Sequence, residues 1–433
     1  MERARRDGRY LLWIGCGIFL VIGTLWMIAF AGSQVDFRHV YCSAKCLTEQ
    51  RDPYNPQNVQ RTCEAAGAAP AKDSATNRLF VTRIVYPPSE FAITVPFALL
   101  PFTMSQLLWS ALAAAACMVA VYLIWLTGAA YAPLAAGALL GFYIANSPSL
   151  ILGNPAGIVV GLCAIGAWCL VEERLIAAGV LCLAATLLLK PHDSGLVWLY
   201  FVLAGGAYRR RGWMALAVAA CASLPVILWV THLSPHWMQE METNLQAFTV
   251  RGGINDPGPG TGGGRGILMI TSLQVVFSFL KDDAHFYNLA SYCVCAPLFV
   301  VWMVVTLRAK ISRENAWLAL AAAAPLTMLP VYHRQYDARL IVLMLPACLA
   351  LWVKRDGVGW IALMVTTVAI VLNGDFTWFV LIHFFNQWYP PNGSYLEALP
   401  VPLSLLGAAC FYLWVYARQG SQPAQRAVPA SRS

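Results

Sequence analysis

No charged side chain occurs between Glu90 and Glu172, a stretch long enough to cross a membrane several times. Soluble domains carry about 25% charged residues on average, whereas this chain carries 12% charged and 59% hydrophobic residues. Backbone polar groups cannot stay unpaired in lipid, which leaves helices or a closed barrel. The apolar runs continue over helix lengths without alternating, so the sequence predicts an all-α polytopic membrane protein.

The apolar runs divide into about twelve predicted transmembrane helices. They cover residues 11–31, 105–126, 131–148, 154–171, 175–190, 192–207, 213–231, 286–307, 315–331, 337–353, 358–380 and 400–417. Ala29-Phe30-Ala31 resembles a signal-peptidase site, but the first run is longer than a typical signal-peptide core, which favours a retained anchor.

Arginine and lysine positions set the predicted orientation. The basic start of the chain favours a cytoplasmic N-terminus. If residues 91–100 form a surface or dipping helix and do not cross, Arg209, Arg210 and Arg211 also fall inside. Residues 1–417 then form a single membrane domain with both termini cytoplasmic, and residues 418–433 form a disordered cytoplasmic tail. The net charge of +8 fits positive-inside loops better than nucleic-acid binding.

This orientation leaves two extracytoplasmic segments, 32–104 with short surface helices and 232–284. The second holds Gly258-Pro259-Gly260-Thr261-Gly262-Gly263, which fits a dinucleotide-binding pattern by accident, since no strand precedes it. We expect either a flexible tether or a lid whose Arg251 and Arg265 close on an anionic group. In the first segment Cys63 is expected to pair with Cys42 or Cys46, if any of the three form a disulfide.

All seven histidines fall on the extracytoplasmic face, together with Asp36 directly after the first crossing. They are His39, His192, His232, His236, His285, His333 and His383. An acidic residue at the membrane boundary is costly and indicates function. Asp36 could act as a general base; an ion pair with Arg38 or His39, or a helix-end role, is the alternative.

Cationic side chains at the same depth form two clusters, Lys190 with His192, and His333-Arg334 with Arg339. Such groups suit a phosphate at the headgroup level. Lys190 could equally be an interfacial anchor, and His333 with Arg334 could pair with Asp337. His232 and His236, like Asp282-Asp283 with His285, lack a convincing ligand set, so we expect no metal. Asp282-Asp283 is more typical of a helix cap.

Several short motifs occur in the order found in a known enzyme family. They are Asp36 after the first crossing, Tyr41, Asp52-Pro53-Tyr54, Tyr86-Pro87-Pro88, Pro96-Phe97-Ala98-Leu99-Leu100-Pro101, Leu152-Gly153-Asn154-Pro155, Leu189-Lys190-Pro191 and Tyr336-Asp337. Over about residues 11–350 the chain resembles glycosyltransferase family 87, whose members have the GT-C type of helical bundle. Asn154 stands where the family usually has glutamine.

The resemblance implies an inverting glycosyltransferase that needs no metal or other cofactor. Its donor would be a polyprenyl-phosphate sugar, typically mannose, and its acceptor a lipid or glycan hydroxyl. Asp36 matches the family's catalytic base. The donor phosphate is expected at Lys190, His333, Arg334 and Arg339. Other candidate substrate-binding residues are His39, Tyr41, Tyr86, Asn154, His192, Arg251, Arg265 and Tyr336.

Two other functions compete with this interpretation. A lipid-linked glycan polymerase or ligase also uses outer-face arginine and histidine, but in a large later loop and without an early aspartate. A lipid or sugar transporter would place charges at the membrane midplane and show internal repeats, and neither is evident. We expect a monomeric, multi-pass protein of the inner (plasma) membrane with an extracytoplasmic active site.

Overall fold

The computed structural model describes residues 2–29, 35–68, 81–251, 253, 255–259, 269–380 and 396–420. These residues are helical almost throughout, and no strand occurs among them, which confirms the all-α fold. The longer helices are α1 (Glu2–Ala29), α6 (Phe102–Gly128), α7 (Pro133–Ala145), α8 (Pro155–Val171), α9 (Ile176–Leu189), α10 (Pro191–Ala204), α11 (Gly206–Leu233), α14 (Ala284–Arg308), α15 (Arg313–Met328), α17 (Gly357–Leu372) and α19 (Pro400–Gly420).

Shorter helices complete the described fold. They are α2 (Val35–Thr48), α3 (Pro56–Ala65), α5 (Phe91–Ala98), α12 (Trp237–Thr249), α13 (Leu273–Ser278), α16 (Leu345–Trp352) and α18 (Asp375–Val380), with the 3-10 turns η2 (Pro88–Glu90), η3 (Pro148–Ile151), η5 (Asp337–Met344) and η7 (Leu396–Ala398).

Within the described ranges, five helices are long and apolar enough to cross a membrane. These are α1, α6, α11, α14 and the segment that contains α19. Every predicted crossing overlaps at least one helix, but the count of twelve crossings is not confirmed, because the other helices are short. The predicted crossing 337–353, for example, is divided between the 3-10 turn η5 and α16.

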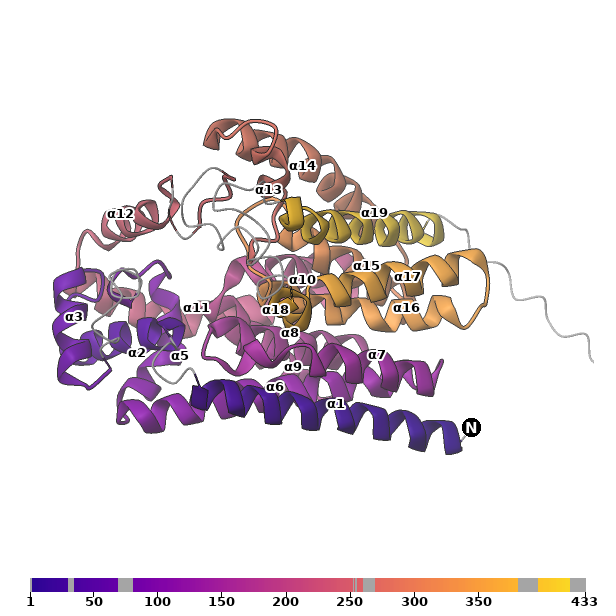
Figure 1. The fold of residues 1–433 in the computed structure, drawn as a ribbon, viewed down its shortest axis with the longest axis horizontal. Coiled ribbons are helices and arrows are strands. Elements are labelled where there is room, and N and C mark those ends of the chain that lie inside the picture. The colour runs from indigo at the N-terminus through magenta and orange to yellow at the C-terminus, as the bar shows by residue number, and fades with distance from the viewer. Residues whose placement is uncertain are drawn as a thin grey trace, which may run out of the picture.

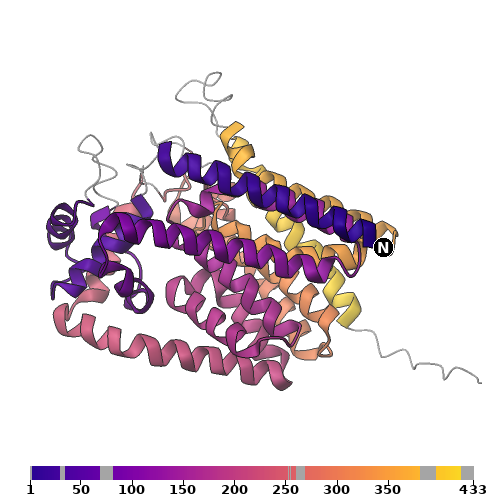
Figure 2. The ribbon, with the colours of Figure 1, turned by 90° about the horizontal axis from the view of Figure 1, so that it is seen from below.

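Helix α1 packs against α7 through glycines. A Cβ atom on Gly15 would lie 2.1 Å from the carbonyl oxygen of Gly141, and one on Gly137 would lie 1.9 Å from that of Gly8. The backbones of the two helices therefore touch, as at small-residue interfaces in membranes. Figure 2 shows α1 lying along the length of the bundle. These contacts fix α1, which ends at Ala29, against α7.

Helices α2, α3, α5 and α12 gather at one end of the bundle, opposite the N-terminus (Figure 1). Aromatic side chains of α2 join this end to α6: the Phe37 ring lies 5.6 Å from that of Trp109. Helix α5 has eight residues, about 12 Å at the usual helical rise, which is too short to cross the bilayer. This agrees with a surface or dipping segment at residues 91–100.

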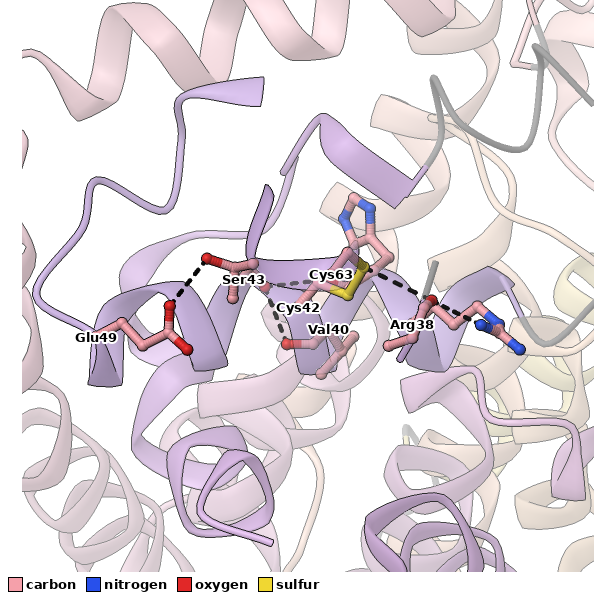
Figure 3. The surroundings of a disulfide bond; sticks show 9 residues. Arg38, Val40, Cys42, Ser43, Glu49 and Cys63 are labelled. Atoms are coloured by element: carbon pink, nitrogen blue, oxygen red, sulfur yellow. Dashed lines mark hydrogen bonds between the residues drawn. A yellow bond between two sulfur atoms is a disulfide. The ribbon is translucent and has the colours of Figure 1, made fainter. Parts of the chain in front are cut away.

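A disulfide between Cys42 and Cys63 joins α2 to α3 (Figure 3). The sequence left Cys42 and Cys46 open as partners of Cys63. The structure selects Cys42, and Cys46 is a free, buried thiol whose Sγ lies 3.3 Å from the carbonyl oxygen of Asp52. The disulfide ties the helix that carries Asp36 to its neighbour.

Replacing Cys42 by serine is expected to lower the free energy of unfolding by about 3 kcal/mol, since the cross-link closes a loop of 21 residues. Thermal unfolding of the purified protein measures this loss, and Cys46→Ser, which removes a free thiol, should cost much less. Labelling of Cys63 by a maleimide in unfolded, unreduced protein would contradict the cross-link.

Candidate active site

The segment Gly153-Asn154 positions Asp36. Gly153 has a φ of +97°, and a Cβ atom there would lie 2.7 Å from Cβ of Phe37, so only glycine fits between α2 and the start of α8. The Trp109 indole donates to the Gly153 carbonyl at 2.9 Å. Asn154 caps α8 by accepting from the Ala156 amide at 2.9 Å, and its side chain also hydrogen-bonds Asp36.

Asp36 is half-buried, and the residues that follow it in α2 are buried. It lies in the first turn of α2, where the helix dipole favours negative charge. Loss of hydration raises the pKa of Asp36 above its ordinary value, while Arg334, Asn154 and Lys190 lower it in part. The structure thus brings together the three side chains that the sequence placed at one depth. A base with a raised pKa accepts a proton more readily than an exposed aspartate.

Lys190 lies at the junction of α9 and α10 and is 4% exposed. Its ammonium contacts Asp337, and its Nζ lies 3.2 Å from Oδ2 of Asp193. Nζ also lies 5.5 Å from the centre of the Tyr336 ring. Two carboxylates therefore neutralise Lys190. A snorkelling anchor would place its ammonium in water, so the anchor interpretation does not describe this side chain.

Asp193 links Lys190 to two histidines. Its Oδ1 lies 3.3 Å from Nε2 of His192 and 3.4 Å from Nε2 of His333. Burial lowers the pKa of His333, but Asp193 and Asp337 raise it more, so the pKa lies above its ordinary value. His333 therefore holds a proton more firmly than a free imidazole does. His192 is half exposed, and the centre of its ring lies 5.2 Å from that of His333, with the two rings tilted by 48°.

The side chains of His192, Asp193 and His333 have the composition of a metal site, with ligand atoms within 4.8 Å of one another. Their carboxylate already pairs with Lys190 at 3.2 Å. A divalent ion would have to displace or repel that ammonium. The nearby ammonium of Lys190 therefore disfavours a metal ion at these three side chains.

Arg334 reaches Asp36 from the other side of the bundle. Its guanidinium contacts the Tyr332 hydroxyl and Oδ1 of Asn255, the latter at 3.4 Å. Its backbone amide donates to Oδ2 of Asp337 at 2.9 Å. Residues 333–335 also pair with the segment before α13, since the Gln335 amide donates to the Met269 carbonyl at 3.0 Å. Arg334 and Asp337 are thus joined through the Arg334 backbone amide. The Arg334 guanidinium is close enough to Asp36 to lower the pKa of that carboxyl.

Three aromatic residues border this centre. The centre of the Tyr336 ring lies 5.5 Å from Nζ of Lys190, and the charges of Lys190 and Asp36 act on the Tyr86 hydroxyl. The His39 ring meets the Tyr86 ring edge-on at 5.5 Å. Tyr86 is held by Tyr54, whose hydroxyl donates to the Tyr86 carbonyl at 2.7 Å.

Other predicted site residues have contacts with residues outside this centre. The Tyr41 hydroxyl donates to the Leu100 carbonyl at 2.9 Å, and its ring packs among residues of α2, α3 and α5. Arg339 is 1% exposed and forms an ion pair with Asp375. Arg251 is exposed and pairs with Asp282 at 2.7 Å. Arg265 and His383 fall outside the described residues. Asp283 caps α14, as its sequence context predicted.

Sequence reasoning missed Asp193, Asp337 and Glu90 as members of the buried charge cluster. Glu90 is 2% exposed, and the Lys190 charge acts on it. The available signal was Lys190-Pro191-His192-Asp193, a polar group between two apolar runs. Asp193 lies in the first turn of α10. An aspartate there commonly stabilises the helix dipole, so the sequence alone did not indicate that Asp193 belongs to the charge cluster.

One comparison with known protein families finds a match over part of the chain. Residues 84–255 match the model of glycosyltransferase family 87. The match includes Tyr86, Asn154 and Lys190, whereas Asp36 and Arg334 lie outside it. No curated protein and no solved structure matches the chain significantly.

Proposed function

We propose that the chain is a membrane glycosyltransferase whose donor is a polyprenyl-phosphate sugar, most simply mannose. The match of residues 84–255 to glycosyltransferase family 87 supports this class. The observation that carries this proposal is the position of Asp36 against Arg334 and Lys190. A base for the acceptor hydroxyl and cations for a phosphate leaving group are the two requirements of such a transfer.

The reaction follows from these positions. The Asp36 carboxylate removes the proton of the acceptor hydroxyl as that oxygen bonds to the anomeric carbon. The bond between this carbon and the phosphate oxygen breaks, and the electron pair leaves with the polyprenyl phosphate. Attack from the face opposite the phosphate inverts the configuration. Asp36 finally releases its proton to water.

Arg334 and His333 hold the donor phosphate in this scheme. Arg334 offers a planar fork of donors, which suits phosphate oxygens, and a protonated His333 adds positive charge. Lys190 acts through Asp193 and Asp337, whose two negative charges it partly offsets, so we assign it a positioning role rather than direct contact. Arg339 is excluded from the phosphate site because Asp375 occupies it.

The site is proposed to face the extracytoplasmic side of the plasma membrane. The Cys42–Cys63 disulfide supports this orientation, since disulfides persist in oxidising compartments. The same end carries α2, α3, α5 and α12 (Figure 1). A lipid-linked donor and a lipid or glycan acceptor would meet there without any nucleotide.

Purified full-length protein in lipid nanodiscs tests the donor class. The protein would be incubated with radiolabelled polyprenyl-phosphate mannose, arabinofuranose or glucose, and with membrane lipid extract as acceptor. We expect transfer from one of these donors and none from the matching nucleotide sugars. Transfer from a nucleotide sugar alone, or from no lipid-linked donor, would overturn the proposal.

A further inference from the structure

A pocket of about 210 Å³ lies between the first turns of α15, the last turns of α16 and Gln419 near the end of α19. Tyr131, in the turn between α6 and α7, completes its wall. The turn that joins α16 to α17 lies at the same end of the bundle as the N-terminus, whereas α2 and α5 lie at the other end (Figure 1). The pocket is therefore separate from the centre around Asp36.

This pocket has an apolar interior and charged side chains at its opening. Leu318 is buried, whereas Glu314, one turn before it in α15, and Lys354 are exposed. The Trp317 ring is fixed in the wall, because its indole donates to Oε1 of Glu172 at 3.1 Å. A ligand could therefore bind there with its polar part at the opening and without rearranging the wall.

Three cations belong to this opening or lie directly beside its residues in the chain. Lys354 lines the pocket, and Arg355 and Arg418 each neighbour a lining residue in the sequence. None of these three forms an ion pair with a carboxylate within the described ranges. Arg313, in contrast, pairs with Oε1 of Glu172 at 2.9 Å. The three cations can therefore act on a ligand.

Two carboxylates offset this positive charge only in part. Glu314 lines the pocket, but it is exposed, so water and salt screen its charge. Asp356 is the cap of α17, where it accepts from the Gly359 amide at 2.8 Å. Three cations against two carboxylates leave a net positive charge, which favours an anionic ligand.

We propose that this pocket binds the head group of an anionic phospholipid from the leaflet at the end of the bundle that carries the N-terminus. Basic pockets between membrane helices at the cytoplasmic face commonly bind such head groups, and tryptophan and tyrosine are frequent at the membrane interface. The volume is below the range of about 300–1,000 Å³ that encloses a whole small molecule, so the acyl chains stay outside. Val353, which lines the pocket and is 47% exposed, offers them an apolar contact.

The test is a titration of the full-length protein in detergent with phosphatidylglycerol or phosphatidylcholine, measured by native mass spectrometry. The wild type is expected to bind one phosphatidylglycerol more tightly than phosphatidylcholine. Lys354→Gln should raise the Kd of phosphatidylglycerol about 10-fold, because a charge-assisted hydrogen bond to the phosphate is lost. Lys310→Gln is the matched control, since Lys310 is exposed shortly before α15 but does not line the pocket, and its Kd should stay within about 2-fold of the wild type.

A second variant tests the space and not the charge. Ala350 lines the pocket, so Ala350→Phe should fill it and weaken phosphatidylglycerol binding, with thermal unfolding as the check that the variant is folded. Equal losses in Lys354→Gln and Lys310→Gln would indicate general attraction to a basic surface and overturn the pocket assignment, as would no loss in either. Displacement of the lipid by equimolar glycerol 3-phosphate would overturn it too, because the ligand would then be a soluble phosphate. No sugar donor enters this experiment, so its outcome is independent of the proposed function.

Discussion

Replacing Asp36 by asparagine is expected to reduce kcat by about 10²- to 10⁴-fold, the usual contribution of a general base. Asparagine keeps the size of the side chain and its contact with Asn154 but cannot take the acceptor proton. Initial rates with the lipid-linked donor measure the loss. Thermal unfolding should change little, since the variant removes a carboxylate whose burial is costly.

Asp283→Asn is the matched control. Asp283 caps α14 by accepting from the Phe286 amide at 2.8 Å, and asparagine caps helices equally well. This variant should keep both activity and stability. If Asp36→Asn retained wild-type kcat, Asp36 would have only a structural role and the proposed mechanism would fail.

The raised pKa of Asp36 has a measurable consequence for the pH profile. The base works only when deprotonated, so activity is lost as the pH falls through its pKa. Because that pKa lies above the ordinary 3.8, the loss should begin at a higher pH than for an exposed aspartate. This acidic limb of kcat/KM should disappear from the residual activity of Asp36→Asn.

Replacing Lys190 by methionine is expected to destabilise the protein by about 3–5 kcal/mol. The substitution leaves Asp193 and Asp337 buried without their cation, and breaking a buried pair from one side carries a cost of this size. The measurement is thermal unfolding of the purified protein. Lys190→Met combined with Asp337→Asn should recover part of the loss, because one of the two uncompensated charges is removed.

The kinetic outcome distinguishes two roles of Lys190. A positioning role predicts that stability and activity fall together and recover together in the double variant. If Lys190→Met unfolded like the wild type but lost activity with a higher donor KM, Lys190 would bind the phosphate directly. That result would contradict the ion-pair account of this residue.

The sequence predicted the helical class well, because that class follows from composition and charge along one dimension. The absence of charge between Glu90 and Glu172 indicated burial in lipid, and the position of Asp36 at the membrane edge stays a prediction. The cations Lys190 and Arg334 were also found, since charged residues between apolar helices are conspicuous.

Pairings across the bundle were beyond the sequence, because they depend on how distant helices pack. Nothing in the local pattern assigns Arg339 to Asp375 or Lys190 to Asp337. The predicted lengths of some crossings were also wrong, because 3-10 turns such as η5 interrupt apolar runs that are continuous in the sequence. Likewise, Cys42 and Cys46 are one helical turn apart, and only packing of α3 selects between them.

The close packing of α1 on α7 has a consequence for how the protein is purified and stored. The two helices meet backbone to backbone at Gly15 and Gly141, and α1 precedes Asp36 by a short link. A protease that cut this link would leave the remaining helices in the bilayer, yet Asp36 would no longer be covalently connected to α1. An intact N-terminal junction is therefore a sensible quality check for any preparation whose turnover is measured.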